Sequence, residues 1–182
     1  MKTNFLGGKD MPKYGMTSKV ENETDLVLEK IYEAPQEEVF QLFTNTEQLE
    51  KFWGPTGWEL IHSTMDFRPK GEWHYSMRSM NERSKTFGME SWGKAIYQEI
   101  HAPSKIVFHD YFADKTGEIN REMPVAEMTI EFAALDEGQT IIVSRARYNS
   151  PEELQSLLDS GMVEGRSETW DRLSEYITYL RG

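Results

Sequence analysis

Alternation of apolar and polar residues through the middle of the chain is the feature that most restricts its fold. In residues 72–80, EWHYSMRSM, the side chains of Trp73, Tyr75 and Met77 alternate with polar ones. Successive side chains of a strand point to opposite faces, so this segment predicts a strand with one apolar face. The other segments typical of strands are 90–100, 105–112, 126–135 and 140–148. Short turns rich in Gly, Pro and Asp separate them, which predicts antiparallel neighbours.

A long amphipathic helix is predicted at the end of the chain. Trp170, Leu173, Tyr176, Ile177 and Leu180 recur at steps of one, three and four residues and form one apolar stripe. A single antiparallel sheet of this length needs a cover on one face, because its apolar side chains must be buried. The helix is the natural cover, and a helix laid on a curved sheet packs imperfectly. We therefore expect a cavity between them.

The first part of the domain combines one strand with two short helices. Residues 25–34 are typical of a strand, and Pro35 suits the first position of a helix. A second helix is predicted over residues 45–53, capped by Asn45 or Thr46 and stopped by the glycine and proline that follow. The predicted fold class is α+β: a curved antiparallel sheet of about seven strands wrapped on a long C-terminal helix. Residues 1–22 are expected to be a flexible tail, and 23–182 a single domain.

This order of elements, with several short motifs, resembles a known superfamily. The motifs are Ala34-Pro35 before Val39-Phe40, then Trp53-Gly54-Pro55, and finally Gly161-Met162 before the C-terminal helix. Together they resemble the START and birch-pollen-allergen (SRPBCC) superfamily, which has the helix-grip fold. Within it the chain is similar to the group named after the activator of heat shock protein 90 ATPase. The likeness extends over roughly residues 24–180.

The resemblance implies a fold and a range of functions. Such proteins hold an apolar cavity between sheet and helix; some bind lipids, polyketides or hormones, some are enzymes, and others regulate a chaperone. Fold alone does not choose among these. Two departures from the common pattern, Phe52 in place of a first tryptophan and Lys70-Gly71 in place of paired glycines, imply differences in the lining of the cavity and in one turn.

Composition excludes several classes of function. The formal net charge is -11, which disfavours nucleic acids and anionic membranes as partners. The chain has no cysteine, which removes disulfides and thiolate sites and fits a cytoplasmic location. Neither a signal peptide nor a membrane span is apparent.

No catalytic or metal-binding motif is present. Phosphate-binding loops, nucleophile elbows and zinc signatures are missing from the sequence. The four histidines, at 62, 74, 101 and 109, have no short metal-ligand spacing. We therefore predict no metal and no cofactor, and we assign no catalytic residue. If the protein is an enzyme, Asp110 is the acid to test, because it interrupts the aromatic residues of its strand.

The expected ligand cavity is lined by the inward side chains of the sheet, by Trp53 and by the closing helix. The candidates are Trp53, Trp73, Tyr75, Met77, Phe108, Asp110, Phe112, Met128, Ile130, Phe132, Met162 and Trp170. Arg145 and Arg147 lie two residues apart and share a strand face. If that face is concave, they would bind an anion; otherwise they face solvent or pair with carboxylates of a neighbouring strand.

Two functions remain open from the sequence. The first is binding of a small apolar or aromatic molecule, without assigned catalysis. The second is a protein-interaction module that regulates a chaperone, which rests on the resemblance alone and would use Trp58 or a sheet edge. A homodimer is a further partner prediction.

Overall fold

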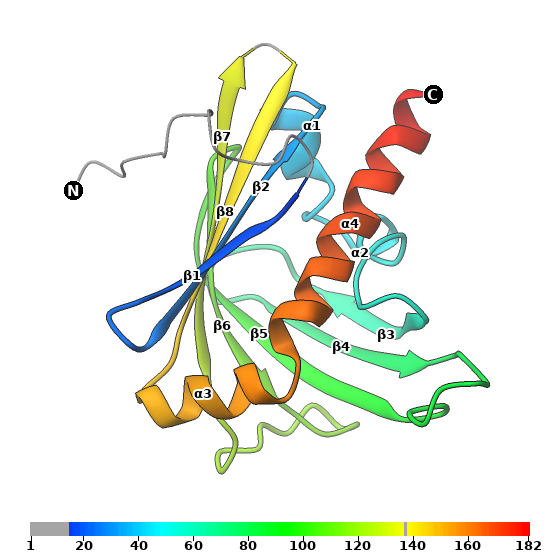
Figure 1. Ribbon diagram of the computed structural model, residues 1–182, viewed down its shortest axis with the longest axis vertical. Helices are drawn as coiled ribbons and strands as arrows, with labels where there is room; N and C mark the ends of the chain where they lie inside the picture. The colour runs from blue at the N-terminus through cyan, green and yellow to red at the C-terminus, as the bar shows by residue number, and fades with distance from the viewer. Residues whose placement is uncertain (1–14, 137) are drawn as a thin grey trace.

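The computed structural model describes residues 15–136 and 138–182, which contain one sheet and four helices (Figure 1). The strands are β1 (Thr17–Glu21), β2 (Asp25–Tyr32), β3 (Trp58–Met65), β4 (Glu72–Ser79), β5 (Glu90–His101), β6 (Lys105–Phe112), β7 (Ala126–Asp136) and β8 (Gln139–Arg147). The helices are α1 (Gln36–Gln41), α2 (Thr46–Leu49), α3 (Pro151–Asp159) and α4 (Met162–Arg181). The strands form one antiparallel sheet in the order β1-β2-β8-β7-β6-β5-β4-β3.

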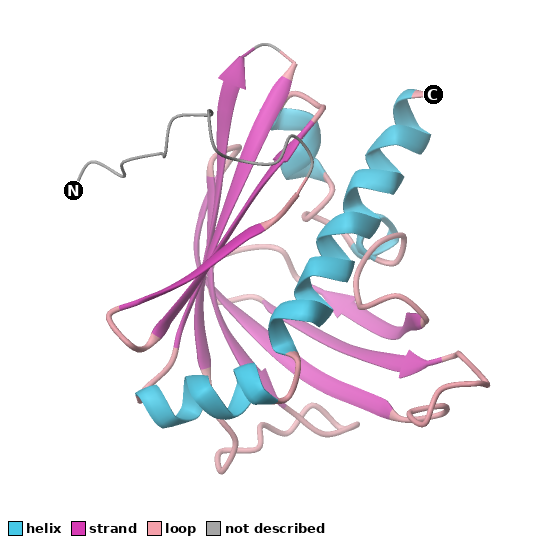
Figure 2. Cartoon of the chain, viewed as in Figure 1, coloured by secondary structure: helices cyan, strands magenta, loops and turns pink. Residues whose placement is uncertain are grey.

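The predicted helix-grip fold is confirmed. The long helix α4 crosses the sheet, and the strands spread to either side of it (Figures 1 and 2). The helix starts also follow the sequence: Asn45 and Ser150 cap α2 and α3 by accepting hydrogen bonds from the backbone N–H of Gln48 and Glu153, at 3.0 and 3.2 Å. Between α3 and α4, Gly161 adopts a φ of 89°, a left-handed conformation that favours glycine.

The sheet has eight strands because the expected tail contributes one. Strand β1 pairs with β2 from Thr17 opposite Glu29 to Glu21 opposite Asp25. The prediction that residues 1–22 form a flexible tail is therefore wrong for 17–21. Residues 1–14 of that prediction lie outside the described residues. The short polar segment of β1 shows no clear alternation of apolar and polar residues. Its pairing with the edge of β2 determines its conformation.

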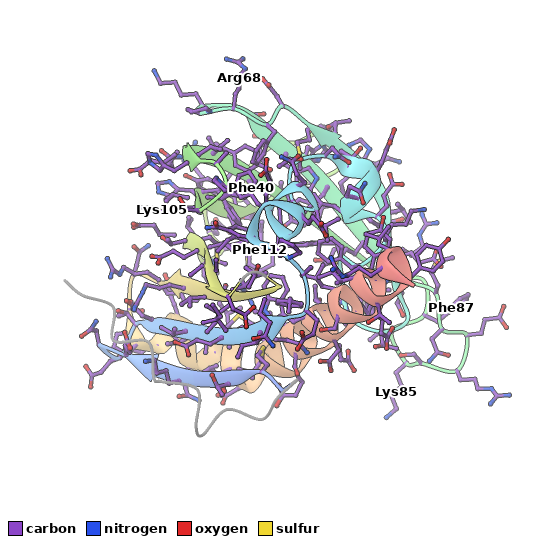
Figure 3. All side chains as sticks on the ribbon, turned by 90° about the horizontal axis from the view of Figure 1, so that it is seen from above. Phe40, Arg68, Lys85, Phe87, Lys105 and Phe112 are labelled. Atoms are coloured by element: carbon purple, nitrogen blue, oxygen red, sulfur yellow. The ribbon has the colours of Figure 1, made fainter. Side chains whose placement is uncertain are left out.

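The main core fills the space between the sheet and the helices. Val39, Phe40, Phe52 and Leu173 are at most 1% exposed and pack against inward side chains of the sheet. A small second cluster, Val27, Ile141 and Val143, lies on the opposite face. In the view from above, Phe40 lies within the molecule, while Arg68, Lys85 and Phe87 lie at its periphery (Figure 3).

Polar contacts from both sides hold α4 in place. The buried Lys30 of β2 forms an ion pair with Asp171 of α4 at 2.5 Å. On the other side, Nη1 of Arg172 donates to the carbonyl of Gly54 at 2.7 Å and to that of Trp58 at 3.1 Å. The helix is thus tied both to the sheet and to the turn that follows α2. Among the described helices, none is both long enough and apolar enough to cross a membrane.

Candidate functional site: a cavity beneath the C-terminal helix

A cavity of about 380 Å³ lies between the first half of α4 and the strands β4 to β7. The volume falls in the range typical of small-molecule sites. Apolar and aromatic side chains form most of its wall, with a few polar groups among them. The residues that line it include Trp53, Tyr75, Met77, Trp92, Phe108, Asp110, Tyr111, Phe112, Ala126, Met128, Tyr148, Leu157, Met162, Arg166, Thr169 and Trp170.

One carboxyl group faces the cavity from the middle of the sheet. Asp110 lies on β6, and its Oδ1 accepts a hydrogen bond of 2.8 Å from the hydroxyl of Tyr75 on β4. The two strands do not pair with each other, because β5 lies between them. Tyr75 reaches across β5 at Gly93, its register partner; a Cβ atom on Gly93 would lie 2.6 Å from the tyrosine ring. The missing side chain therefore makes room for the contact.

The environment of this pair changes its acidity. Burial raises the pKa of Asp110 to about 6, although the hydrogen bond from Tyr75 and the charge of Arg166 oppose the change. Burial also raises the pKa of the Tyr75 hydroxyl, and the neighbouring Asp110 raises it further. Tyr75 thus stays protonated and donates, while the carboxyl group can gain or lose a proton near neutral pH.

Arg166 supplies a positive charge on the opposite wall of the cavity. It projects from the second turn of α4, and its Nη1 and Nη2 atoms each approach the sulfur of Met128 at 3.9 Å. A thioether is a weak acceptor. Arg166 also acts on the neutral hydroxyl of Tyr148, where it opposes the rise in pKa that burial causes. Arg166 is half-buried, and no described carboxylate lies within the 4.0 Å of an ion pair.

Aromatic side chains close one end of the cavity. The ring of Trp53 lies edge to face with those of Trp73, Tyr75 and Trp170, with centroids 5.0, 6.4 and 6.4 Å apart. Such edge-to-face contacts are favourable and hold large rings in defined positions. Trp53 thus packs at the end of the cavity. Trp58 begins β3 and is only partly buried, and it is absent from the cavity wall.

Nine of the twelve residues predicted for the cavity lie on its wall. They are Trp53, Tyr75, Met77, Phe108, Asp110, Phe112, Met128, Met162 and Trp170. The other three belong to the adjoining core, where Trp73 and Ile130 border a void of about 20 Å³ and Phe132 packs against Phe40 and Phe43. The nine that lie on strands face the same side of the sheet, as the alternation predicts. Packing decides which of them reach the cavity.

The structure does not place Arg145 and Arg147 at the cavity. They share the outer face of β8 with Ile141 and Val143, the face opposite α4. Both guanidinium groups pair with the fully buried Asp25, at 2.9 and 3.0 Å, and Arg145 also pairs with Glu21. Their charges are satisfied within the protein, by partners on β1 and β2, because the neighbouring strands bring these carboxylates to the same face.

Sequence reasoning missed two polar groups that the fold brings to the cavity. Arg166 lies on α4 outside the predicted apolar stripe, and Tyr148 lies beyond the end of β8. The hydroxyl of Tyr148 lies 3.3 Å from the sulfur of Met162. The spacing of Met162, Arg166 and Trp170, four residues apart, is the signal that could have placed Arg166 on the inner face of α4.

The fold also brings together two histidines that are twelve residues apart. His62 of β3 and His74 of β4 approach on the outer face, with Nε2 and Nδ1 3.2 Å apart. Burial and the neighbouring imidazole lower the pKa of His62. Within residues 15–136 and 138–182, no group of three or more His, Cys, Asp or Glu side chains has the geometry to hold a metal ion.

Comparison with known proteins places this architecture in a family. The family model described as "Activator of Hsp90 ATPase homolog 1-like protein" matches residues 33–178, which is most of the chain. No curated protein matches the chain.

Solved structures share the fold over nearly the whole molecule. Protein Ms6760 from Mycobacterium smegmatis is 28% identical, with a TM-score of 0.77, and the alignment covers 88% of this chain and 94% of that one. A protein from Staphylococcus epidermidis is 25% identical with a TM-score of 0.70, covering 87% and 92% of the two chains. A protein from Arthrobacter aurescens is 24% identical with a TM-score of 0.77, covering 87% and 88%.

Proposed function

The chain belongs to the Activator of Hsp90 ATPase homolog 1-like family, and from this premise we propose that it binds a small, largely apolar molecule in the cavity beneath α4. The observation that carries the proposal is the cavity itself, about 380 Å³ of space with a wall that is mostly aromatic and aliphatic. A concave site of this size with a mainly apolar wall and a few polar groups is typical of small-molecule binding sites.

The composition of the wall supports a ligand with one aromatic or alicyclic core. Trp53, Phe108 and Trp170 offer ring faces and edges, and Met77 and Met128 can adapt to irregular shapes. Burial of such a ligand would be favourable by roughly 25 cal/mol for each Å² of apolar surface removed from water. We assign no catalytic step: the polar groups present, Asp110, Tyr75 and Arg166, suffice to orient a ligand.

A fluorescence titration tests the proposal. A panel of flavonoids, fatty acids and polyketides, with 2-naphthol as a simple probe, is titrated while the tryptophan emission is recorded. Trp53 and Trp170 line the cavity, so ligand binding should change the emission. Saturable binding of at least one class is expected.

A matched pair of variants locates the binding. Ala126 lies on the cavity wall, and Ala126→Leu would fill part of the space. Ala133 lies on the outer face of the same strand, so Ala133→Leu adds the same atoms away from the cavity. Loss of binding in Ala126→Leu alone supports the proposal, provided that circular dichroism shows both variants folded. Equal binding by both variants would place the ligand elsewhere and contradict it.

Regulation of a chaperone remains a prediction that rests on the family description. Its test is a pull-down with purified Hsp90 and an ATPase assay, with Trp58→Ala as the interface variant. Self-association is measured in parallel by light scattering. A rise in ATPase rate that Ala126→Leu leaves unchanged and Trp58→Ala abolishes would favour this function over ligand binding in the cavity.

A further inference from the structure

Arg166 is a charged side chain of the cavity wall whose contacts within the described residues are to neutral groups, the sulfur of Met128 and the hydroxyl of Tyr148. The wall contains two ionisable groups of opposite sign, Asp110 on β6 and Arg166 on α4. Asp110 accepts a hydrogen bond from Tyr75, whereas the Arg166 guanidinium contacts the sulfur of Met128 and the hydroxyl of Tyr148, where it opposes the rise in pKa that burial causes. A guanidinium has five N–H donors in a planar fork that matches a carboxylate.

Asp110 does not satisfy Arg166 directly. The two groups influence each other through their charges, but their atoms lie beyond the 4.0 Å limit of an ion pair. They therefore leave a gap between the helix and the sheet into which both project. The arrangement differs from that of Asp25, where two arginines touch one carboxylate and close the site.

We propose that the cavity selects an apolar carboxylic acid whose carboxylate binds Arg166 and whose ring system lies against Trp53, Phe108 and Trp170. This deepens, and rests on, the proposed ligand-binding function. A carboxylate that replaces the Met128 contact would form charge-assisted, bidentate hydrogen bonds, which are about twice as strong as neutral ones. Asp110, held by Tyr75 across the cavity, would accept a hydrogen bond from a hydroxyl or amide on the far side of the ligand.

The alternative ligand is a cation that pairs with Asp110. Two features favour the acid. The carboxyl group of Asp110 already has a donor in Tyr75, at 2.8 Å. Arg166 would repel a cationic ligand in the same cavity.

Matched naphthalene derivatives test this selectivity. The dissociation constants of 2-naphthoic acid, 2-naphthalenemethanol and 2-naphthylmethylamine are measured by calorimetry at pH 7.5 with the full chain. These probes share the ring system and differ in the charge of the head group. We expect the acid to bind about tenfold more tightly than the alcohol, the effect of one charge-assisted contact, and the amine to bind most weakly.

Variants assign the effect to Arg166. Arg166→Gln should remove the preference for the acid and leave the affinity for the alcohol within about twofold, while Arg166→Lys should keep part of the preference because the charge remains. Arg83→Gln, at an exposed position outside the cavity, makes the same change in net charge and should leave all three constants unchanged.

The outcomes distinguish this inference from the proposed function. If the alcohol and the acid bind equally in the cavity, or the amine binds best, the preference for a carboxylic acid is wrong although ligand binding stands. The same holds if Arg166→Gln and Arg83→Gln weaken the acid to the same extent. If none of the probes binds and Ala126→Leu changes nothing, both the proposed function and this inference are wrong.

Discussion

The hydroxyl of Tyr75 donates a 2.8 Å hydrogen bond to Asp110 across an intervening strand, over the bare backbone of Gly93. This relationship sets the polar centre of an otherwise apolar cavity. It also makes the stability of the protein depend on pH, because the carboxyl group is partly withdrawn from water and lies next to a tyrosine that keeps its proton.

Asp110→Asn should stabilise the protein at neutral pH. The pKa of Asp110 is raised from 3.8 to about 6 in the folded state, so the native protein binds the proton more tightly than the unfolded chain. Its contribution to stability is therefore fully present below pH 4 and is lost as pH rises through 6. Asparagine stays neutral, so the variant should gain about 2 kcal/mol over the natural chain at pH 7.5, and much less at pH 4. Urea denaturation at the two pH values measures this; a difference that is constant with pH would contradict it.

Gly93→Ala should disrupt the hydrogen bond between Tyr75 and Asp110, because the added methyl group would displace the tyrosine ring. A Cβ atom at this position would lie 2.6 Å from the ring and the hydroxyl of Tyr75, too close for any rotation of a stiff ring to relieve cheaply. We expect a loss of about 1–3 kcal/mol of stability, measured by thermal unfolding. Nuclear magnetic resonance of Asp110 should show a changed pKa once Tyr75 is displaced. An unchanged melting temperature would contradict this prediction, because it would mean that β4 and β5 accommodate the added methyl group without loss of stability.

Gly165→Ala makes the same substitution as Gly93→Ala, but we expect it to increase the stability of the protein. Gly165 lies within α4, and an added Cβ would meet Pro55 at 3.5 Å, an ordinary contact. Alanine is favoured over glycine in a helix by about 1 kcal/mol. The melting temperature should therefore rise, and a fall would mean that α4 approaches the turn at Pro55 more closely than this contact indicates.

Arg172→Met should loosen the turn that follows α2. A single nitrogen of Arg172 lies within 3.4 Å of four backbone carbonyls, those of Trp53, Gly54, Pro55 and Trp58. Methionine keeps most of the apolar stem but none of the donors, so about 2 kcal/mol of stability should be lost. Arg181→Met, at the exposed end of the same helix, should cost less than 1 kcal/mol because its ion pair with Glu38 is on the surface. Urea denaturation compares the two; equal losses would rule out a special role for Arg172.

Asp25→Asn should destabilise the outer face and alter its response to acid. Burial by itself would raise the pKa of Asp25, but hydrogen bonds from Arg147, Thr24 and Arg145 outweigh it and lower the pKa below 3.8. Its stabilising contribution is therefore present above that value and is lost as pH falls below it. Removal of the charge leaves two arginines without their shared partner and should cost about 3 kcal/mol at pH 7. This loss of stability, measured by urea denaturation, should become smaller below pH 4. A loss that persists there would indicate that it comes from altered packing and not from the missing charge.

The class of fold follows from the local order of apolar and polar residues. Apolar residues recur every second position at Trp73, Tyr75 and Met77, and every third or fourth position at Trp170, Leu173 and Ile177. Each period belongs to one kind of backbone, so strands, a closing helix and their inward faces follow from local order alone. The twelve cavity candidates accordingly face inward, whether they border the cavity or the core beside it.

The pairing of charged side chains depends on how the elements pack together. Arg145 reaches Asp25 and Glu21 because β2 and β1 lie beside β8, and Arg166 enters the cavity because of the rotation of α4 on the sheet. The same packing brings Tyr75 to Asp110 over Gly93, and makes β1 a strand through its pairing with β2. The physical reason is that residue period specifies the face a side chain takes on its own element, whereas an ion pair or a cavity depends on the register and angle between elements far apart in the chain.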